Sequence, residues 1–560
     1  MNKFPTSYAG SFVRIKDNQE NIVRYDINNL APGINFQEQH IIKLNEHKRV
    51  DWIINRLCDH ANGVLQPCAD RDTAECPLHG WKLDLNNLHY KNVDVKKQTS
   101  MFEINNDVIE VHQHAAHLRL PVEITESQPQ QHEINVRFLA HASLLITCDN
   151  LKIITDPWLQ GPCFLNGWWH KPCPPDDAMD ELLSADVVYL SHNHPDHTHD
   201  ETLAELQKHR PDIPIVIPKF KSRSAEWPVR KLGFTNINSL PFNQIFKVGS
   251  GSTYLSIFKS GDFRDDSGLY VTNGKRQVLI TVDSSILNRL ILPMDIDLLA
   301  SSFSGGASGY PWSFDHYSEA EKSQIASRRH QSVKQSIIDN ITACNARSFL
   351  PYAGYFEESA LRDHYIKEHN RKISCDEIKS LIDHHCPDVG FIDPTQTDNI
   401  TVADTIEALK LDAQRQLVNN QETINTYLQK EIQPKVEILF DALCKYFSDC
   451  DFKDDLVLFL QPSTAEFDPY DKGIVADFST GATPSVSIHD GTLLLDEYNK
   501  PADNIRKLHI IVRASQLWDV ISHYKSWEEL SIGFHCRIHR TPDVYNSRFW
   551  YHFSNIYIQH

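Results

Sequence analysis

The segment SHNHPDH, Ser191 to His197, directly follows the apolar run ADVVYL and carries four metal-binding side chains: His192, His194, Asp196 and His197. A group of imidazoles and a carboxylate this dense, at the end of an apolar strand, is typical of a metal site. Alternate residues of an extended chain point the same way, so His192 and His194 can share one metal ion. Asp196 and His197 then turn back toward a second ion. We predict a dinuclear site; the alternative is a degenerate site that has kept the motif without metal.

The pattern HxHxDH resembles the metal motif of the metallo-β-lactamase fold, in which the motif also follows a strand. Two further aspartates end predicted strands, Asp156 in TDPW and Asp283 in QVLITVD. The resemblance implies that Asp283 is the carboxylate that bridges the two metal ions. We interpret Asp156 as a hydrogen-bonding support for the metal loop, since carboxylates behind a metal ligand often orient it.

The choice of metal depends on a histidine that the chain lacks. Zinc hydrolases of this fold normally supply another histidine before the bridging aspartate, but none occurs between His209 and Asp283. The loop KSGDFRDDSG offers carboxylates instead, and we predict that Asp262 takes the vacant position. Oxygen-rich ligand sets favour iron over zinc. The last ligand of the second metal ion stays open between three candidates: Glu357, Glu358 and His364.

A second metal signature lies upstream, in CDH at 58–60 and CPLHGW at 76–81. Its spacing is C-x-H, fifteen residues, then C-x-x-H. This is the ligand pattern of a Rieske [2Fe–2S] cluster, in which two thiolates hold one iron and two imidazoles hold the other. We predict that Cys58, His60, Cys76 and His79 hold such a cluster; the alternative is a structural zinc site made of the same four residues.

The pattern of predicted elements indicates an α+β multidomain protein. Short β-rich segments fill residues 1–130, which we assign to an N-terminal Rieske β-domain. Residues 131–400 alternate strand-like runs with helical stretches such as DETLAELQKH, as a central αββα domain of the metallo-β-lactamase type would. Residues 401–560 form a C-terminal mixed α/β region, which we expect to begin with a helical stretch from about Thr401 to Phe447.

Composition narrows the function and the compartment. The formal net charge of −19 argues against a general nucleic-acid-binding protein, which needs a basic face. No apolar run approaches the roughly 20 residues that cross a membrane, and the N-terminus lacks a secretory signal. The twelve cysteines are too scattered for a disulfide scaffold. We therefore expect a cytoplasmic enzyme without a membrane or nucleic-acid partner.

The two signatures together favour an oxygenase. A hydrolase has no use for a one-electron relay, whereas a Rieske cluster beside a carboxylate-rich dinuclear site can deliver single electrons for the reductive activation of dioxygen. The sequence predicts a Rieske-coupled, non-haem diiron monooxygenase that uses O2 and a small-molecule substrate. Two other readings stay open: a zinc hydrolase of the metallo-β-lactamase fold, and an electron-transfer protein with an inert second site.

Several stretches from about residue 50 to the C-terminus resemble the CMP-N-acetylneuraminate hydroxylases. They include CPLHGWKLDLNNLHY, TDPWLQGPCFLNGWW, ADVVYLSHNHPDH, FSGGASGYPWSF and LSIGFHCRIHRTPDVYNSRFWYHF. The resemblance implies hydroxylation of the N-acetyl group of a CMP-sugar to N-glycolyl, with electrons from a reductase through a cytochrome b5- or ferredoxin-like carrier. A same-fold diiron oxygenase that hydroxylates or N-oxygenates another small metabolite is the alternative.

Overall fold

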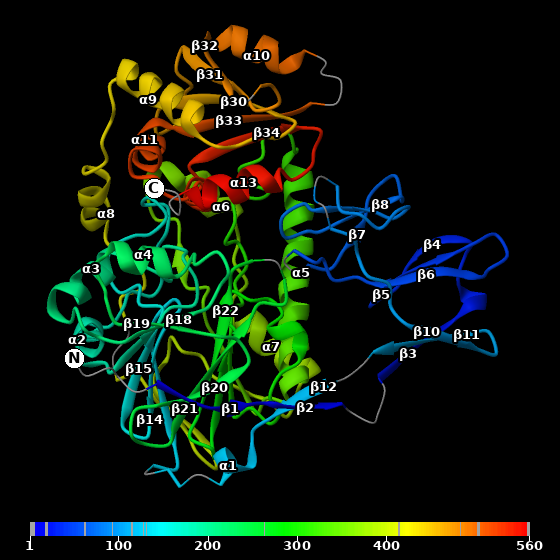
Figure 1. Ribbon diagram of the computed structural model, residues 1–560, viewed down its shortest axis with the longest axis vertical. Helices are drawn as coiled ribbons and strands as arrows, with labels where there is room; N and C mark the ends of the chain where they lie inside the picture. The colour runs from blue at the N-terminus through cyan, green and yellow to red at the C-terminus, as the bar shows by residue number, and fades with distance from the viewer. Residues whose placement is uncertain are drawn as a thin grey trace.

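The computed structural model describes residues 6–16, 21–60, 63–91, 93, 95–113, 116–126, 128, 129, 131–262, 264–412, 415–481, 483–500 and 505–556. Figure 1 shows three parts: a central body of strands, a C-terminal part above it in yellow to red, and an N-terminal part in blue at its side. The long helix α5 (Glu319–Cys344) runs along the central body on the side of the N-terminal part.

Two eight-stranded sheets form the central body. In order across the sheet, the first contains β1 (Thr6–Ser11), β20 (Gln244–Val248), β21 (Thr253–Lys259), β22 (Ser267–Thr272), β23 (Gln277–Ile280), β24 (Leu298–Ser301), β25 (Ser348–Pro351) and β27 (Gly390–Phe391). The second contains β19 (Ile237–Leu240), β18 (Ile215–Pro218), β17 (Val187–Tyr189), β15 (Leu151–Thr155), β14 (Ser143–Cys148), β13 (Ile134–Ala140), β28 (Thr397–Val402) and β29 (Ile406–Lys410).

The sheets face each other across one apolar core, and helices cover their outer faces. Ile146 and Val216 of one sheet share this core with Leu255 and Leu279 of the other. Three helices pack on the outside of the second sheet: α2 (Ala178–Ser184), α3 (Asp200–His209) and α4 (Glu226–Lys231). Helices α5 and α7 (Cys375–His385) cover the first. The αββα arrangement is confirmed, and α3 coincides with the stretch DETLAELQKH.

The prediction of a helical stretch from Thr401 to Phe447 is wrong in its first part. Strands β28 and β29 form an antiparallel pair here, and β28 extends the second sheet beside β13. β-branched residues such as Ile400 and Val402 are buried at alternate positions of β28, a period that a strand satisfies and a helix does not. Helices occur later, as α8 (Gln421–Leu428) and α9 (Val436–Asp449).

Strands from both sides cross the domain boundaries predicted at residues 130 and 400. Strand β1 pairs with β20 and so belongs to a sheet of the central body, although it opens the chain. Strand β29 carries the other central sheet on to Lys410. The two boundaries themselves stay predictions.

The C-terminal part is a five-stranded sheet with helices around it. Its strands, in order across the sheet, are β32 (Ser485–Asp490), β31 (Lys472–Asp477), β30 (Leu456–Ser463), β33 (Arg506–Arg513) and β34 (Cys536–Thr541). Besides α8 and α9, its helices are α10 (Gly491–Asn499), α11 (Ala514–His523), α12 (Glu528–Ile532) and α13 (Ser547–Ser554). A separate aromatic-rich core holds it together, with Phe447, Trp527 and Phe553 among its members.

The N-terminal part is built from small antiparallel sheets around two small apolar clusters. Its strands are β3 (Asn21–Asp26), β4 (Gly33–Phe36), β5 (His40–Leu44), β6 (Val50–Asn55), β7 (Gln66–Pro67), β8 (Thr73–Glu75), β9 (Lys82–Asp84), β10 (Phe102–Asn105) and β11 (Val108–Gln113). The strand pair β2 (Val13–Lys16) and β12 (Ala116–Arg119) and the helix α1 (Val122–Thr125) lie against the central body instead, since Leu118 and Ile124 belong to its core. The Val64 amide donates to Ser332 Oγ of α5 at 2.7 Å, so this part is anchored to the central body.

The remaining strands and the remaining α-helix are short. They are the strand pair β16 (Trp169–His170) and β26 (Phe356–Glu357), and the helix α6 (His364–His369). None of the helices in the described ranges combines the length and the apolar character that crossing a lipid bilayer would require.

Candidate metal centres

The predicted ligands of the dinuclear site gather at one edge of the two sheets. The segment Ser191–His197 follows β17, Asp156 follows β15, and Asp283 lies in the turn after β23. Strands β15 and β17 run parallel, so their carboxyl ends meet at the same edge. Ligand sites of sheet proteins commonly form at such an edge, because neighbouring strands present their loops together there.

Asp156 anchors the Ser191–His197 segment through hydrogen bonds. Its Oδ1 accepts from the Ser191 amide at 2.7 Å, and its Oδ2 accepts from Ser191 Oγ at 2.7 Å. The same Oδ2 lies 3.0 Å from His197 Nδ1. All three residues are fully buried, so these bonds fix the loop and hold a proton on Nδ1 of His197. The other ring nitrogen, Nε2, is left for a metal ion.

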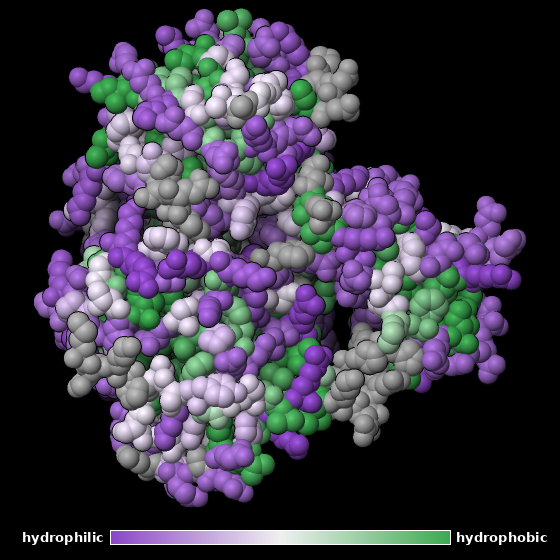
Figure 2. Space-filling view, viewed as in Figure 1, coloured by the Kyte–Doolittle hydropathy of each residue, from purple (hydrophilic) through white to green (hydrophobic). Residues whose placement is uncertain are grey.

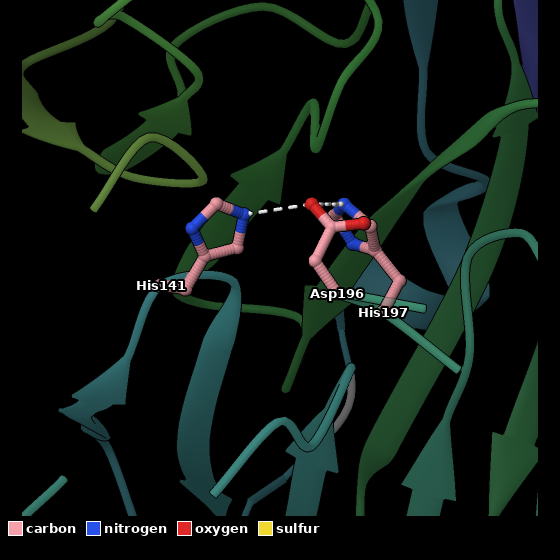
Figure 3. A group of neighbouring side chains, drawn as sticks. All are labelled: His141, Asp196 and His197. Carbon is pink, nitrogen blue, oxygen red and sulfur yellow. Dashed lines mark ion pairs between the residues drawn. The ribbon is translucent and has the colours of Figure 1, made fainter. Parts of the chain in front are cut away.

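One group of ligand atoms consists of His141, Asp196 and His197 (Figure 3). Asp196 Oδ2 lies 3.1 Å from His141 Nε2 and 3.2 Å from His197 Nε2. The three side chains are buried. Nitrogen and oxygen donors that converge within one coordination distance can hold a single metal ion.

A second group shares His197 and adds His192 and Asp283. Asp283 Oδ2 lies 3.5 Å from Nε2 of His197, the residue that the two groups share. His192 Nε2 lies 2.9 Å from His194 Nδ1, which puts both nitrogens on one side of the loop. Of the predicted ligands, the structure therefore brings together His192, His194, Asp196, His197 and Asp283.

The electrostatic environment of the two ligand groups favours a bound cation. Burial alone would lower the pKa of His197, but the Asp196 and Asp283 carboxylates raise it well above its usual value. Three buried atoms at the cluster have no hydrogen-bond partner: Asp196 Oδ1, His141 Nδ1 and His197 Nε2. Buried polar atoms without partners are costly, and a metal ion would satisfy those that face it. The mixed nitrogen and oxygen donors suit iron.

Asp262, the carboxylate predicted for the vacant position, is not brought into either group. Its Oδ1 accepts from the Arg264 amide at 3.0 Å, and its Oδ2 accepts from Arg264 Nε at 3.1 Å. The Asp262 carboxylate, which we predicted would bind the metal ion, is therefore hydrogen-bonded to Arg264 instead. Asp266 of the same loop approaches the other nitrogen of His192, with Oδ1 3.6 Å from Nδ1. It supports that ring from the side away from His194.

The three candidates for the last ligand lie elsewhere. Glu357 pairs with Lys171 at 2.6 Å and with Lys367 at 2.9 Å. Glu358 is buried against Lys372. His364 keeps 71% of its side chain exposed, beside Glu368. None of them belongs to the two ligand groups of the described residues.

His141 belongs to one of the two ligand groups, unlike these three candidates, and sequence reasoning missed it. It directly follows β13, which runs antiparallel to β14 as β14 does to β15. Strand β13 therefore points the same way as β15, and its carboxyl end reaches the metal edge. The available signal was a histidine just after the predicted strand INVRFLA.

The N-terminal signature is folded into two facing loops. The Cys58 amide donates to Gly63 O at 2.9 Å, and the Cys76 amide donates to Trp81 O at 2.8 Å. Both cysteines are fully buried. A Cβ built on Gly63 would lie 2.6 Å from Cys76 Sγ, so only glycine lets the first loop approach the second so closely.

The arrangement of the four side chains suits a two-iron cluster better than one zinc ion. The rings of His60 and His79 lie 4.9 Å apart, and the Nδ1 atom of each is buried without a hydrogen-bond partner. All four residues are described, yet no three of their ligand atoms lie within 4.8 Å of one another. Four ligands of a single zinc ion would lie that close together, whereas in a [2Fe–2S] cluster the thiolates bind one iron and the imidazoles bind the other. None of the chain's twelve cysteines, all of which the structure describes, forms a disulfide.

The charge of Arg264, which lies beside the dinuclear ligands, acts on both histidines of the N-terminal signature. Burial lowers the pKa of His79 well below its usual value, and the charges of His60, Arg264 and Asp262 also act on it. Arg264 in turn donates to the backbone oxygen of Asp283 at 3.3 Å. Residues more than 180 positions apart are therefore electrostatic neighbours.

These features define a protein of the metallo-β-lactamase fold with a dinuclear metal-ligand set. A family model described as "Beta-lactamase superfamily domain" matches residues 135–256. The chain is 29% identical to the cytidine monophosphate-N-acetylneuraminic acid hydroxylase of Danio rerio, over 94% of this chain and 92% of the relative. It is 30% identical to the protein of that name from Xenopus laevis, over 89% and 86%. The chain belongs to the cytidine monophosphate-N-acetylneuraminic acid hydroxylase family.

A solved structure adds a distant similarity. CmlA, a diiron β-hydroxylase from Streptomyces venezuelae, is 16% identical, with a TM-score of 0.30, over 51% of this chain and 55% of that chain. Because this similarity is so low, the assignment of the chain to a family rests on the sequence relatives alone.

Proposed function

We propose that this chain is a Rieske-coupled, non-haem diiron monooxygenase that hydroxylates the N-acetyl group of a CMP-sialic-acid-like substrate to N-glycolyl. The relatives' name, cytidine monophosphate-N-acetylneuraminic acid hydroxylase, supports the substrate class, because the similarity covers about nine-tenths of both chains. One structural observation carries the redox part. Arg264 donates to the backbone oxygen of Asp283 at 3.3 Å, and its charge helps to lower the pKa of both His60 and His79.

In this proposal Cys58, Cys76, His60 and His79 hold the cluster. The dinuclear iron site takes His192 and His194 at one ion, and His141, Asp196 and His197 at the other, with Asp283 between them. When bound, the cluster supplies electrons one at a time and the iron pair activates dioxygen for hydroxylation of a C–H bond. A cytochrome b5- or ferredoxin-like carrier is the proposed electron donor.

The chain's own residues orient the ligands and exclude water. Asp156 keeps the proton of His197 on Nδ1. An aromatic wall covers His141, since its ring lies 5.3 Å from that of Trp158, and Trp168 stacks on Phe356 with ring centroids 3.5 Å apart. Restricting water to one side protects a reactive site from side reactions.

One side of the dinuclear site remains open for substrate. Asp283 keeps 23% of its side chain exposed, His194 25% and Arg264 28%, while Asp196 and His197 are buried. His194 also lies 3.3 Å from Glu528 of the C-terminal part, and Figure 2 shows the surface hollowed between that part and the central body. A small substrate can therefore reach the bridging carboxylate side of the site.

The test is the metal content of anaerobically purified protein, followed by turnover. We expect about four iron and two sulfide per chain, and a Rieske EPR signal after reduction with dithionite. Incubation with CMP-N-acetylneuraminate, O2 and a reduced carrier should give a product heavier by one oxygen atom. About two iron, two sulfide and two zinc per chain, retained under metal-controlled expression, would contradict the diiron proposal. A diiron protein that leaves this substrate unchanged would contradict the substrate class alone.

A further inference from the structure

The C-terminal part reaches both metal centres. Glu528 opens helix α12, and its Oε2 lies 3.3 Å from His194 Nε2. Tyr545 lies between β34 and α13, with its ring 5.9 Å from that of His60 and 6.0 Å from that of Trp81. In Figure 1, β34 and α13 lie on the side of the C-terminal part that faces the rest of the chain.

The contact of Glu528 is of a kind that serves a metal ligand. His194 Nδ1 faces His192 Nε2 at 2.9 Å, so Nδ1 is the nitrogen on the metal side. Nε2, the other nitrogen, then carries the proton and donates it to Glu528. Histidines that bind metal usually donate their second nitrogen to a carboxylate, which fixes the tautomer and the orientation of the ring. His197 has the same arrangement with Asp156 inside the central part.

We propose that the C-terminal part belongs to the redox unit: Glu528 is the positioning residue for His194, and Tyr545 covers the His60 side of the cluster site. This inference rests on the proposed function for the identity of the two metal groups. It assigns a task to the one part of the chain that contributes none of the proposed metal ligands.

A close backbone contact fixes α12 against the metal edge. A Cβ built on Gly533 would lie 2.4 Å from Phe164 O, and one built on Gly167 would lie 2.4 Å from Gly533 O. Trp168 Nε1 donates to Ile532 O at 3.0 Å, beside this contact. The end of α12 is therefore held to the tryptophan-rich loop that also covers His141. This contact keeps the short helix, and with it Glu528 at its start, next to His194.

Tyr545 joins two cores. It packs partly buried against the aromatic core of the C-terminal part and against the core that surrounds Cys58 and Cys76. Burial raises the pKa of Tyr545, and the charge of Glu528 raises it further, which agrees with the two side chains being neighbours. A single surface of the C-terminal part thus spans from the cluster site to the dinuclear site.

The first experiment measures how tightly the full-length protein holds the dinuclear metal. Anaerobic competition with a ferrous chelator is run on wild type, E528Q and E528A, and the Rieske EPR signal is the internal reference. We expect E528A to release one of the two dinuclear iron ions at about 10- to 100-fold lower chelator concentration, with E528Q between E528A and wild type. The matched control is E437Q, at an exposed glutamate in the first turn of α9.

The second experiment concerns the cluster. We expect Y545L to lose the cluster absorbance in air several-fold faster than wild type, while Y551L, at a tyrosine of α13 that is 68% exposed, behaves like wild type. Circular dichroism of each variant shows whether it folds. If a variant does not fold, E528D or Y545F, which keep the carboxylate or the ring, are measured instead, and we expect them to approach wild type.

The outcomes separate the two proposals. Wild-type chelator profiles in folded E528A, or wild-type bleaching in folded Y545L, would overturn the inference about that residue and leave the proposed function standing. A wild type that holds zinc would end the diiron proposal instead. The same competition, run with a zinc chelator, would then still decide whether Glu528 supports His194.

Discussion

The two metal centres are built in opposite ways. The four predicted N-terminal ligands come from two short loops, the two cysteines lie in one small core, and a few backbone bonds set the shape of the loops. The dinuclear ligands come from the ends of β13, β17 and β23, which are far apart in sequence and belong to two large sheets. A site built from loops depends on the bound metal for part of its folding free energy. The packing of the strands largely holds a site built on sheets in place, with or without metal.

Loss of either metal group should have the largest effect, with a different structural result at each site. C58S should lack about two iron and two sulfide per chain, and it should make the loops around residues 58–81 sensitive to protease. D283A should lack about two iron and keep both the Rieske signal and the protease resistance of wild type. Metal analysis with limited proteolysis checks both. Equal protease sensitivity of the two variants would remove the contrast.

His141 should behave as a metal ligand and His364 should not. Removing a ligand from the group with Asp196 and His197 leaves that ion with fewer donors, so we expect H141A to retain about one dinuclear iron per chain. H364A, at an exposed side chain, should keep both. Iron analysis with EPR distinguishes these results. Loss of iron in H364A but not in H141A would indicate that the last ligand lies in the segment 357–364.

The buried ion pair between the central and C-terminal parts should matter more for stability than any exposed pair. Arg513 NH1 lies 2.7 Å from Asp363 Oδ1, and each side chain is only 1% exposed. D363A leaves a buried guanidinium without its partner, which typically costs about 3–5 kcal/mol of unfolding free energy. Denaturant unfolding followed by tryptophan fluorescence measures it. The control is D398A, which removes a half-exposed partner of Arg137 and should cost less than about 1 kcal/mol.

The contact between the N-terminal and C-terminal parts should be weaker and should depend on pH. Asp543 accepts from Lys82 Nζ at 2.8 Å, Tyr317 OH at 2.8 Å and Arg540 Nε at 2.7 Å. Burial opposes the charge, but His316, Arg540 and Lys82 lower the pKa of Asp543 well below its ordinary value. D543N should cost about 1–3 kcal/mol at neutral pH.

The sign of this pH dependence follows from the direction of the shift. Because the folded pKa is lower than the unfolded one, the unfolded chain binds more protons at acid pH. The contribution of Asp543 is therefore present above about pH 4 and falls as the pH drops toward its folded value. The stability difference between wild type and D543N should shrink on acidification. A constant difference from pH 7 to pH 3 would show that another group carries the contact.

Sequence reasoning found the motifs because their chemistry is local. C-x-H and C-x-x-H, or HxHxDH after an apolar run, need only a few neighbouring residues to be recognisable, and Asp283 was found because it ends a strong strand. The same reasoning assigned Thr401–Phe447 to a helical stretch, since the apolar spacing of that segment fits a helix as well as two short strands. Pairing of β28 with β13 decided between them.

The sequence by itself determined the ligand types, the spacing of the N-terminal signature, the αββα order of the central body and the family. Only the tertiary structure decided which residues complete the dinuclear ligand groups and support them. His141 joins because β13 points toward the metal edge, Asp262 stays outside the two ligand groups because Arg264 binds its carboxylate, and Glu528 arrives from more than 330 residues away. The physical reason is that a ligand or its support is defined by distance in space, and long-range packing sets that distance after local chemistry has supplied the candidates.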